Sequence, residues 1–304
     1  MRKGKKMWLN GRIVDWEEVK VHVISDTFNY GYGCFEGIRC YKTPKGRAVF
    51  RLREHIDRLF NSARILYLNI PYSRDDLITA VVESVRANDF ESCYIRPLVY
   101  VSTYAENTWD FRNAKVDVAV AVWDWGDYIS KDALAQGIRV KTSSITRHHI
   151  NVIMTKAKAN ANYINCIMAR GEALRAGFDE ALLLDVNGCV AEGPVEIIFM
   201  VKKGELITPP LTYILEGITR DSVLTLAKDQ GITCRETYFT RDQLYGAEEA
   251  FFCGTAAEVT PIREIDYIPI GNGKVGPMTK KIIDLYFNVA RGKVEKYSEW
   301  LHVV

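Results

Sequence analysis

The sequence predicts an α+β (mixed α/β) fold divided into two domains. The chain has 304 residues, enough for two domains of ordinary size. Hydrophobic residues make up 48% and charged residues 26% of it, the balance of a globular chain with a full-sized core. Strand patterns and helix patterns are mixed in both halves, and no internal repeat or low-complexity segment interrupts them. We expect a first domain at 1–124, a linker at 125–133 and a second domain at 134–304.

Charge and cysteine content exclude several classes of partner. Forty Lys and Arg against 38 Asp and Glu leave a net charge of +2, which offers no large basic face for nucleic acid or an acidic membrane. We therefore expect a small-molecule partner. The seven cysteines are scattered without a C-x-x-C pair, which argues against a disulfide framework and a zinc site and favours reduced thiols in a cytoplasmic protein. The basic N-terminus runs into a strand pattern and is predicted to be neither signal peptide nor membrane anchor.

The first domain begins with β-structure. Residues 7–14 alternate as a strand and turn at Asn10-Gly11, a favoured hairpin pair. At 30–41 glycines stand beside aromatic residues. They predict either a site where the backbone can be approached closely beside a wall of aromatic rings, or a β-bulge with the aromatic residues in the core. Arg39 lies between apolar neighbours and needs a partner if it is buried.

Two helices and two strands complete this domain. Apolar spacing predicts a helix at 52–66, and Ser73 is the expected N-cap of a second helix that ends near Ala87. Residues 92–103 and 115–125 are rich in Val, Tyr and Trp and predict strands. Proline within the first of these, at Arg96-Pro97, predicts an edge or a bulge, where the arginine faces a cleft or pairs with a surface carboxylate.

The second domain repeats the mixture. We expect a strand at 137–143 and a helix that follows Lys158 directly and closes at Gly177. Its predicted apolar stripe consists of Tyr163, Ile164, Ile167, Met168 and Leu174. A strand at 180–185 and a hairpin turn at 187–188 come next. In the following stretch, 189–201, Glu192 beside Gly193-Pro194 is expected to open a strand, where it could pair with a pyridine nitrogen or lie exposed at an edge. A helix at 278–289 is the last expected element, and 293–304 is expected to be a surface addition.

The stretch 155–163, TKAKANANY, holds the residue with the clearest chemical potential. A lysine amine can condense with an aldehyde cofactor, most commonly pyridoxal 5′-phosphate (PLP), which serves as an electron sink for amino-acid carbanions. Lys158 is the candidate. On the pattern alone, a lysine at a helix start is more often a solvated charge than a catalytic group.

Two later stretches have the form of anion sites. In LEGITRDSV a helix is expected to start near Thr219, which leaves the N–H groups of Ile218 and Thr219 without helix partners. In FFCGTAAEV, Gly254 lets backbone amides near Thr255 close on a ligand. For each, the alternative is an ordinary helix cap or turn.

Seven motifs, in this order, resemble the branched-chain amino-acid aminotransferases, which are fold-type IV PLP enzymes. They are YGCFEGIR (32–39), REHIDRL (53–59), YIRPL (94–98), KANANY (158–163), AEGPVE (191–196), GITRD (217–221) and CGTAAEVTP (253–261). The resemblance implies a small N-terminal α/β domain, a larger C-terminal domain and a cofactor in the interdomain cleft. It also implies a homo-oligomer, dimer or higher.

The resemblance assigns a role to each candidate site residue. Lys158 would form the Schiff base with PLP, Tyr163 would bond its phenolic oxygen, and Glu192 would hold its pyridine nitrogen protonated. The phosphate ligands implied are Arg58, Ile218, Thr219 and Thr255. The substrate side chain would meet a wall of Tyr30 from a partner subunit, Phe35, Trp125, Tyr128 and Tyr163. Arg96, supported by Arg39, would bind glutamate's distal carboxylate, and Tyr94, Ala256 and Ala257 would receive the α-carboxylate. The implied reaction is transamination between leucine, isoleucine or valine and 2-oxoglutarate.

Three stretches depart from the family pattern. Ile197 stands where an asparagine is usual, 103–111 reads TYAENTWDF, and TRHHINVIMTKAK precedes the lysine without its usual proline. The rings at 103–111, Trp109 among them, predict either a broadened substrate range that includes aromatic amino acids or amines, or packing between subunits. D-amino-acid aminotransferase, amine transaminase and aminodeoxychorismate lyase activities on the same fold, and a non-catalytic PLP-binding protein, remain the alternatives.

Overall fold

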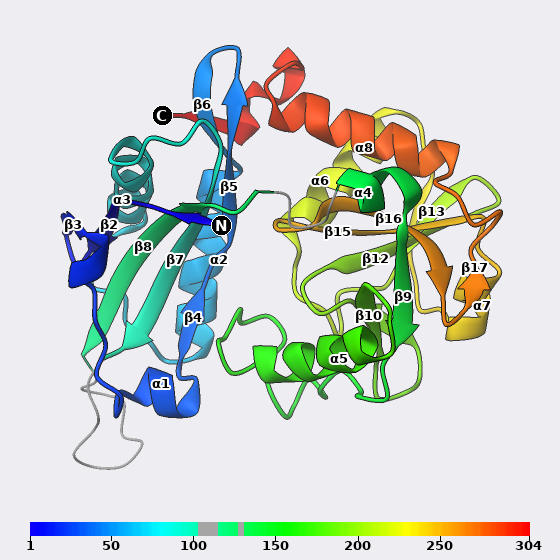
Figure 1. The fold of residues 1–304 in the computed structure, drawn as a ribbon, viewed down its shortest axis with the longest axis horizontal. Coiled ribbons are helices and arrows are strands. Elements are labelled where there is room, and N and C mark those ends of the chain that lie inside the picture. Colours follow the sequence, from blue (N-terminus) through cyan, green and yellow to red (C-terminus); the bar gives the residue numbers. More distant parts are fainter. Residues whose placement is uncertain (103–114, 127–130) are drawn as a thin grey trace. The chain divides into compact units, whose positions relative to one another are not determined.

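The computed structural model describes residues 1–102, 115–126 and 131–304 (Figure 1). Its contacts divide the chain into two compact units. The first contains Met1–Gly126, Lys156–Ala161 and Val289–Val304, and the second contains Asp127–Thr155 and Asn162–Asn288. The domain limits expected from the sequence stay a prediction. The segments 103–114 and 127–130, which include Tyr128 and Trp109, lie outside the described residues.

The first unit is built on a sheet in the order β18-β6-β5-β7-β8-β2-β3, with β1 on β8 and β4 on β7. Helices α2 and α3 pack against its strands and enclose an apolar core that includes Ile38, Ile56, Leu59 and Ile95. The strands are β1 (Arg2–Lys3), β2 (Lys6–Leu9), β3 (Arg12–Asp15), β4 (Gly33–Phe35), β5 (Ile38–Thr43), β6 (Gly46–Phe50), β7 (Cys93–Val101), β8 (Val116–Asp124) and β18 (Leu301–Val303). The helices are α1 (Asp26–Tyr30), α2 (Leu52–Ile65), α3 (Arg74–Arg86) and two 3₁₀ turns at Trp16–Glu18 and Glu295–Trp300.

Local sequence signals explain several of these elements. Asn10 and Gly11 both have positive φ, 46° and 94°, as the expected hairpin turn between β2 and β3 requires. Ser73 caps α3: its Oγ accepts from the Asp76 amide at 3.1 Å, and the Asp76 side chain accepts from the Ser73 amide at 2.8 Å. The predictions of the hairpin, of α2 and of α3 are confirmed to within two residues.

The second unit holds a sheet in the order β11-β10-β9-β16-β15-β12-β13-β14, with β17 on β16. Its core includes Ile198, Phe252, Leu182 and Val140. The strands are β9 (Ile138–Thr142), β10 (Glu180–Leu184), β11 (Val190–Glu192), β12 (Ile197–Lys202), β13 (Glu205–Thr208), β14 (Cys234–Glu236), β15 (Glu249–Gly254), β16 (Glu258–Ile265) and β17 (Ile268–Pro269). The helices are α4 (Lys131–Gln136), α5 (Tyr163–Arg175), α6 (Ile218–Asp229), α7 (Arg241–Tyr245) and α8 (Pro277–Ala290).

Helix α5 differs from its prediction in start and in orientation. It begins at Tyr163, so Lys158 lies in the preceding loop and not at the helix entry. The expected apolar stripe is on the exposed side, with Ile164, Ile167, Met168 and Leu174 each more than half exposed. The small residues Cys166, Ala169 and Ala173 are buried instead, because they let the helix approach β10 closely.

Three further expectations were wrong. The C-terminal segment is not a surface addition: β18 pairs with β6, Tyr297 is buried, and the Arg51 amide donates to the Trp300 carbonyl at 2.7 Å. Pro97 is not on an edge strand, because β7 has neighbours on both sides. It lies opposite the gap between β4 and β5, where its missing N–H interrupts no ladder bond. Glu192 does not open a strand: it ends β11, and β12 begins only at Ile197, after a turn in which the Gly193 amide donates to the Glu196 carbonyl.

Candidate active site

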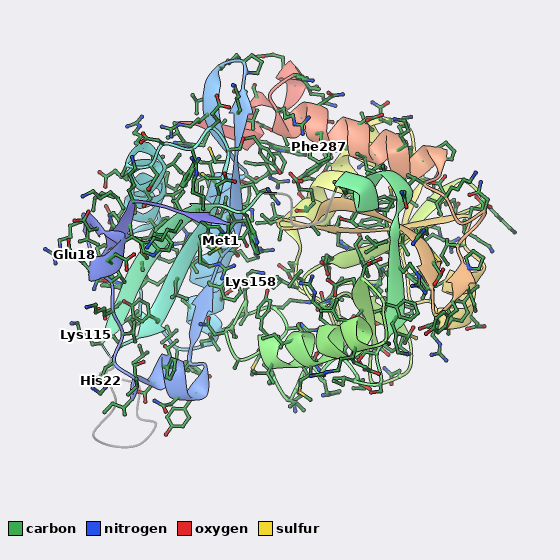
Figure 2. All side chains as sticks on the ribbon, viewed as in Figure 1. Met1, Glu18, His22, Lys115, Lys158 and Phe287 are labelled. Atoms are coloured by element: carbon green, nitrogen blue, oxygen red, sulfur yellow. The ribbon has the colours of Figure 1, made fainter. Side chains whose placement is uncertain are left out.

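The backbone of Lys158 is bound to the first unit through strand β4. The Phe35 amide donates to the Lys158 carbonyl at 3.1 Å, and the Asn160 amide donates to the Gly33 carbonyl at 2.9 Å. The Lys158 amide in turn donates to Ser62 Oγ of α2 at 2.9 Å. These three bonds fix the loop on both sides of the lysine, which is labelled in Figure 2.

The amine of Lys158 lies in surroundings that favour its neutral form. Its Nζ atom is 5.1 Å from the centre of the Phe35 ring. Burial, followed by the positive charge of Arg58, lowers the pKa of Lys158. A lysine with a depressed pKa is the nucleophile that Schiff-base chemistry needs at neutral pH.

A buried carboxylate organises the basic groups beside this lysine. Glu36 Oε1 accepts from Arg58 Nε at 2.7 Å, and Glu36 Oε2 accepts from Arg58 Nη2 at 2.9 Å. Glu36 Oε2 also lies 2.7 Å from His55 Nδ1. Burial opposes the charge of Glu36, but Arg58 and then His55 outweigh it and leave the pKa of Glu36 below its ordinary value. Burial lowers the pKa of His55 despite Glu36.

Arg96 of β7 is held among aromatic rings. Its Cζ lies 4.4 Å from the centre of the Phe35 ring, 5.4 Å from that of Tyr94 and 5.5 Å from that of Trp123. One bond to the Tyr94 hydroxyl, at 3.3 Å, uses Nη2. The Nε atom is buried and has no hydrogen-bond partner among the described residues, so this guanidinium has capacity to bind an anion.

The neighbouring predicted residues occupy the same unit. Arg39 of β5 pairs in register with Tyr94 of β7. The Trp125 ring is 4.5 Å from that of Tyr94, at an interplanar angle of 83°. Tyr30, at the end of α1, is 58% exposed.

The second unit contains the other predicted cofactor residues, beginning with Glu192. It ends β11, where it pairs in register with Leu183 of β10 and is buried. Its Oε1 atom lies 2.6 Å from Nε of Arg147, a residue that is also buried. Glu192 therefore meets a fixed positive charge and not the solvent of an exposed edge. Tyr163 is the first residue of α5.

Helix α6 has an N-terminus suited to an anion. It begins at Ile218 after Gly217, and no side chain caps it, so its first-turn N–H groups lack helix acceptors. A Cβ atom at Gly217 would lie 2.4 Å from Cδ1 of Ile197 and 3.3 Å from Cβ of Arg220, so the Ile197 side chain would have to shift to admit it. The predicted start at Ile218 and Thr219 is confirmed.

The hairpin loop 255–257 joins β15 to β16. Gly254 precedes it, and a Cβ atom there would lie 2.8 Å from the Val195 carbonyl oxygen. Thr260 Oγ1 donates to the Ala257 carbonyl at 2.7 Å and holds the loop closed. Thr255, Ala256 and Ala257 thus present their backbone from a fixed turn.

Sequence reasoning missed four residues of these surroundings. Glu36 and His55 lie in the quoted motifs. His55 and Arg58 are spaced i and i+3 on one face of α2, and this spacing could have indicated that both side chains bind a common partner. Arg147 lies in a segment that departs from the family pattern, so only the tertiary contact reveals it. Trp123 has a buried Nε1 without a hydrogen-bond partner in the described part of the chain.

Comparison with known proteins defines the class of this site. Residues 33–265 match the family amino-transferase class IV. The chain is 49% identical over 300 residues to the branched-chain-amino-acid aminotransferase of Pseudomonas aeruginosa, covering 98% of this chain and 97% of the relative. It is 44% identical over 304 residues to that of Escherichia coli K12, covering 100% and 98%. The chain belongs to the class IV aminotransferases.

Solved structures agree. The T.th. branched-chain amino acid aminotransferase with pyridoxamine 5′-phosphate superposes with a TM-score of 0.96 at 44% identity, covering 100% of this chain and 99% of that chain. The same enzyme complexed with N-(5′-phosphopyridoxyl)-L-glutamate gives 0.95 over the same shares. The predicted mixed α/β, fold-type IV class is confirmed.

The residues present fit PLP. They include a lysine with a lowered pKa, an arginine beside it, a buried carboxylate and a glycine-preceded helix N-terminus. The described residues contain no group of three or more His, Cys, Asp or Glu that could hold a metal ion. None of the described helices is long and apolar enough to cross a membrane.

Proposed function

We propose that this chain is a PLP-dependent aminotransferase that moves the amino group between the branched-chain amino acids leucine, isoleucine and valine and 2-oxoglutarate. The observation that carries the chemistry is Lys158, whose amine has a lowered pKa and whose backbone is fixed by β4 and α2. Relatives with that activity at 44–49% identity over nearly the whole chain support the substrate class. No comparison favours a D-amino-acid aminotransferase, an amine transaminase or a lyase.

The cofactor roles proposed are divided between Lys158 of the first unit and Tyr163 and Glu192 of the second. PLP, when bound, supplies an electron sink for negative charge at the substrate Cα. Lys158 Nζ would hold the cofactor covalently, and its free amine would take the proton from the substrate Cα. Glu192 keeps a proton on the pyridine nitrogen, and Tyr163 donates to the phenolic oxygen.

The phosphate ligands proposed are Arg58, the first N–H groups of α6 at Ile218 and Thr219, and Thr255. The bidentate bond with Glu36 orients Arg58 and limits the directions in which its remaining N–H groups can point. An uncapped helix N-terminus supplies a partial positive charge without adding a titratable group.

The substrate roles depend on one pocket that accepts both an apolar chain and a carboxylate. The residues proposed for the apolar wall are Phe35, Trp125, Tyr128, Tyr163 and Tyr30 of a second copy. Arg96, supported by Arg39, binds the distal carboxylate of glutamate. Tyr94 and the backbone of Ala256 and Ala257 take the α-carboxylate. The complex of a 44% identical neighbour with a phosphopyridoxyl-glutamate supports glutamate as the dicarboxylate.

We also propose a cytoplasmic homo-oligomer, dimer or higher. Four apolar side chains of α5, Ile164, Ile167, Met168 and Leu174, are exposed in the single chain, which favours contact with a second copy. The seven free cysteines favour a reducing compartment. Light scattering of the wild type and of Ile167→Glu tests the assembly, and a monomeric wild type would refute it.

The function is tested by single-turnover half-reactions of the PLP-loaded protein with L-leucine, D-alanine and no amino acid. The expected result is rapid loss of the cofactor's visible band with L-leucine only, followed by its return on adding 2-oxoglutarate. A faster reaction with D-alanine would establish the D-amino-acid alternative. Absence of any reaction would leave a PLP-binding protein.

A further inference from the structure

Arg147 makes a buried ion pair with Glu192 inside the second unit. The two side chains are 6% and 8% exposed, and Nε of Arg147 lies 2.6 Å from Oε1 of Glu192. Burial opposes the charge of Arg147, but Glu192, Cys166 and Tyr163 together outweigh it and raise the pKa of Arg147. The guanidinium therefore remains charged where it meets the carboxylate.

The remaining contacts of Arg147 fix it in place. Its amide donates to the Leu184 carbonyl of β10 at 2.8 Å. Its Nη1 atom donates to Asn165 Oδ1 at 3.3 Å and lies 3.0 Å from His148 Nδ1. Because a guanidinium only donates, Nδ1 is the unprotonated nitrogen of a neutral His148. Bonds from β10, from α5 and from its own loop thus hold the charge against Glu192.

The other buried carboxylates near this pair are in different states. Burial raises the pKa of Glu196 well above its ordinary value, and the charge of Glu180 adds to the rise. Glu180 lies 3.5 Å from Arg170, a partly exposed residue, and its pKa is also raised. Within the described chain, Glu192 alone of these three carboxylates has a buried guanidinium at hydrogen-bonding distance. Burial thus shifts Glu196 and Glu180 toward their protonated forms, whereas the adjacent Arg147 favours the charged form of Glu192.

A buried ion pair is weak evidence for stability, because desolvation of both charges cancels most of their attraction. Its more specific effect is on the carboxylate itself. An adjacent cation favours the charged form of a carboxyl group and fixes its direction. Charge and direction are what Glu192 needs in order to keep a proton on a pyridine nitrogen.

We propose that Arg147 is a positioning residue for Glu192, which it holds as an oriented anion toward the pyridine nitrogen of PLP. This inference rests on the proposed function, because Glu192 receives its role there. The competing interpretation is a structural ion pair that only joins the loop 144–148 to β11.

Cofactor binding to the apoprotein separates these interpretations without a measurement of turnover. The probes are PLP and 1-deaza-PLP, in which carbon replaces the ring nitrogen, and the readout is the ratio of their dissociation constants. The variants are Arg147→Met, Arg147→Lys, Glu192→Gln and the double variant Arg147→Met/Glu192→Gln. The matched control is Arg139→Met, because Arg139 pairs with Glu264 through Nε and Oε1 at 2.8 Å on other strands of the same unit.

Arg147→Met is expected to weaken PLP binding about tenfold or more relative to 1-deaza-PLP, since a cation at this distance shifts a carboxyl pKa by about 1 to 3 units. Glu192→Gln is expected to change the ratio of dissociation constants by a similar factor. The double variant is expected to have the same ratio as Glu192→Gln alone. Arg147→Lys is expected to restore much of the ratio, and Arg139→Met to leave it unchanged.

If Arg147→Met weakened binding of PLP and of 1-deaza-PLP equally, the inference would be overturned and the ion pair would be structural. If Glu192→Gln also fails to distinguish the two cofactors, the proposed role of Glu192 is wrong as well. Should Arg147→Met not fold, the double variant, which leaves no unpaired buried charge, and Arg147→Lys give the same decision. A further drop in the ratio on adding Arg147→Met to Glu192→Gln would show that Arg147 acts independently of Glu192.

Discussion

Phe35 donates its backbone amide to the carbonyl of Lys158, at 3.1 Å, although 123 positions separate them in the sequence. The Phe35 ring lies 5.1 Å from the Lys158 amine and 4.4 Å from Cζ of Arg96. Phe35 therefore lies against both the proposed nucleophile, Lys158, and the arginine proposed to bind the substrate carboxylate, Arg96.

Lys158→Ala is expected to abolish covalent cofactor attachment and transamination, whereas Lys156→Ala retains both. The reason is the environment of Lys158, whose amine favours the neutral, nucleophilic form. Borohydride reduction followed by peptide mapping identifies the modified lysine. A label on Lys156 would contradict the assignment.

Arg96→Leu is expected to impair the glutamate half-reaction by far more than the leucine half-reaction. Only the dicarboxylate needs a cation in the pocket, and loss of a buried charge-assisted contact costs on the order of 2 to 5 kcal/mol. Single-turnover rates with both amino acids give the comparison, so each enzyme preparation is its own control. Equal losses would mean that Arg96 binds the α-carboxylate or supports the fold.

Glu36→Gln is expected to lower the free energy of unfolding by about 3 to 5 kcal/mol, because it leaves Arg58 buried without its anion. The matched control is Asp57→Asn on the same helix. Asp57 pairs with Arg74 at 2.7 Å, but both side chains are about half exposed, so its loss costs at most about 1 kcal/mol. Urea titration of both variants measures the difference, and similar losses would contradict the importance of the Glu36–Arg58 pair.

Gly217→Ala is expected to weaken binding of PLP and of inorganic phosphate, because the new Cβ lies 2.4 Å from Ile197 Cδ1 and 3.3 Å from Arg220 Cβ and so crowds the first turn of α6. Ile197→Val removes that atom, and the remaining Cγ1 lies 3.6 Å from the Cβ position, an ordinary contact. The double variant is therefore expected to recover phosphate binding, measured by calorimetry. No recovery would show that the overlap is not the cause.

His148 is expected to make the protein less stable in acid. Burial, followed by the charge of Arg147, lowers the pKa of His148 from 6.5 to about 4. The folded state then binds fewer protons than the unfolded state between these values, so the contribution is complete above pH 6.5 and is lost as the pH falls toward 4. Urea midpoints at pH 7 and pH 4.5 are expected to differ less in His148→Asn than in the wild type. An unchanged difference would contradict this.

Short-range signals were sufficient for many elements of the fold. The Asn10-Gly11 hairpin, the cap at Ser73 and the start of α6 follow from residues next to one another, so the sequence by itself predicts them. Motif order likewise predicted the family. These features depend on local backbone preferences and on recognisable spacing.

Contacts between distant segments required the tertiary structure. Residues 156–161 bind β4, β18 pairs with β6, and Arg147 meets Glu192 across 45 positions. Helix α5 buries its small residues and exposes its large apolar ones. The periodicity of the apolar residues alone predicted the opposite face to be buried. The sequence thus determined which local elements form and which family the chain resembles. Only the fold decided which face is buried and which charges meet, because packing and desolvation depend on neighbours that are remote in the chain.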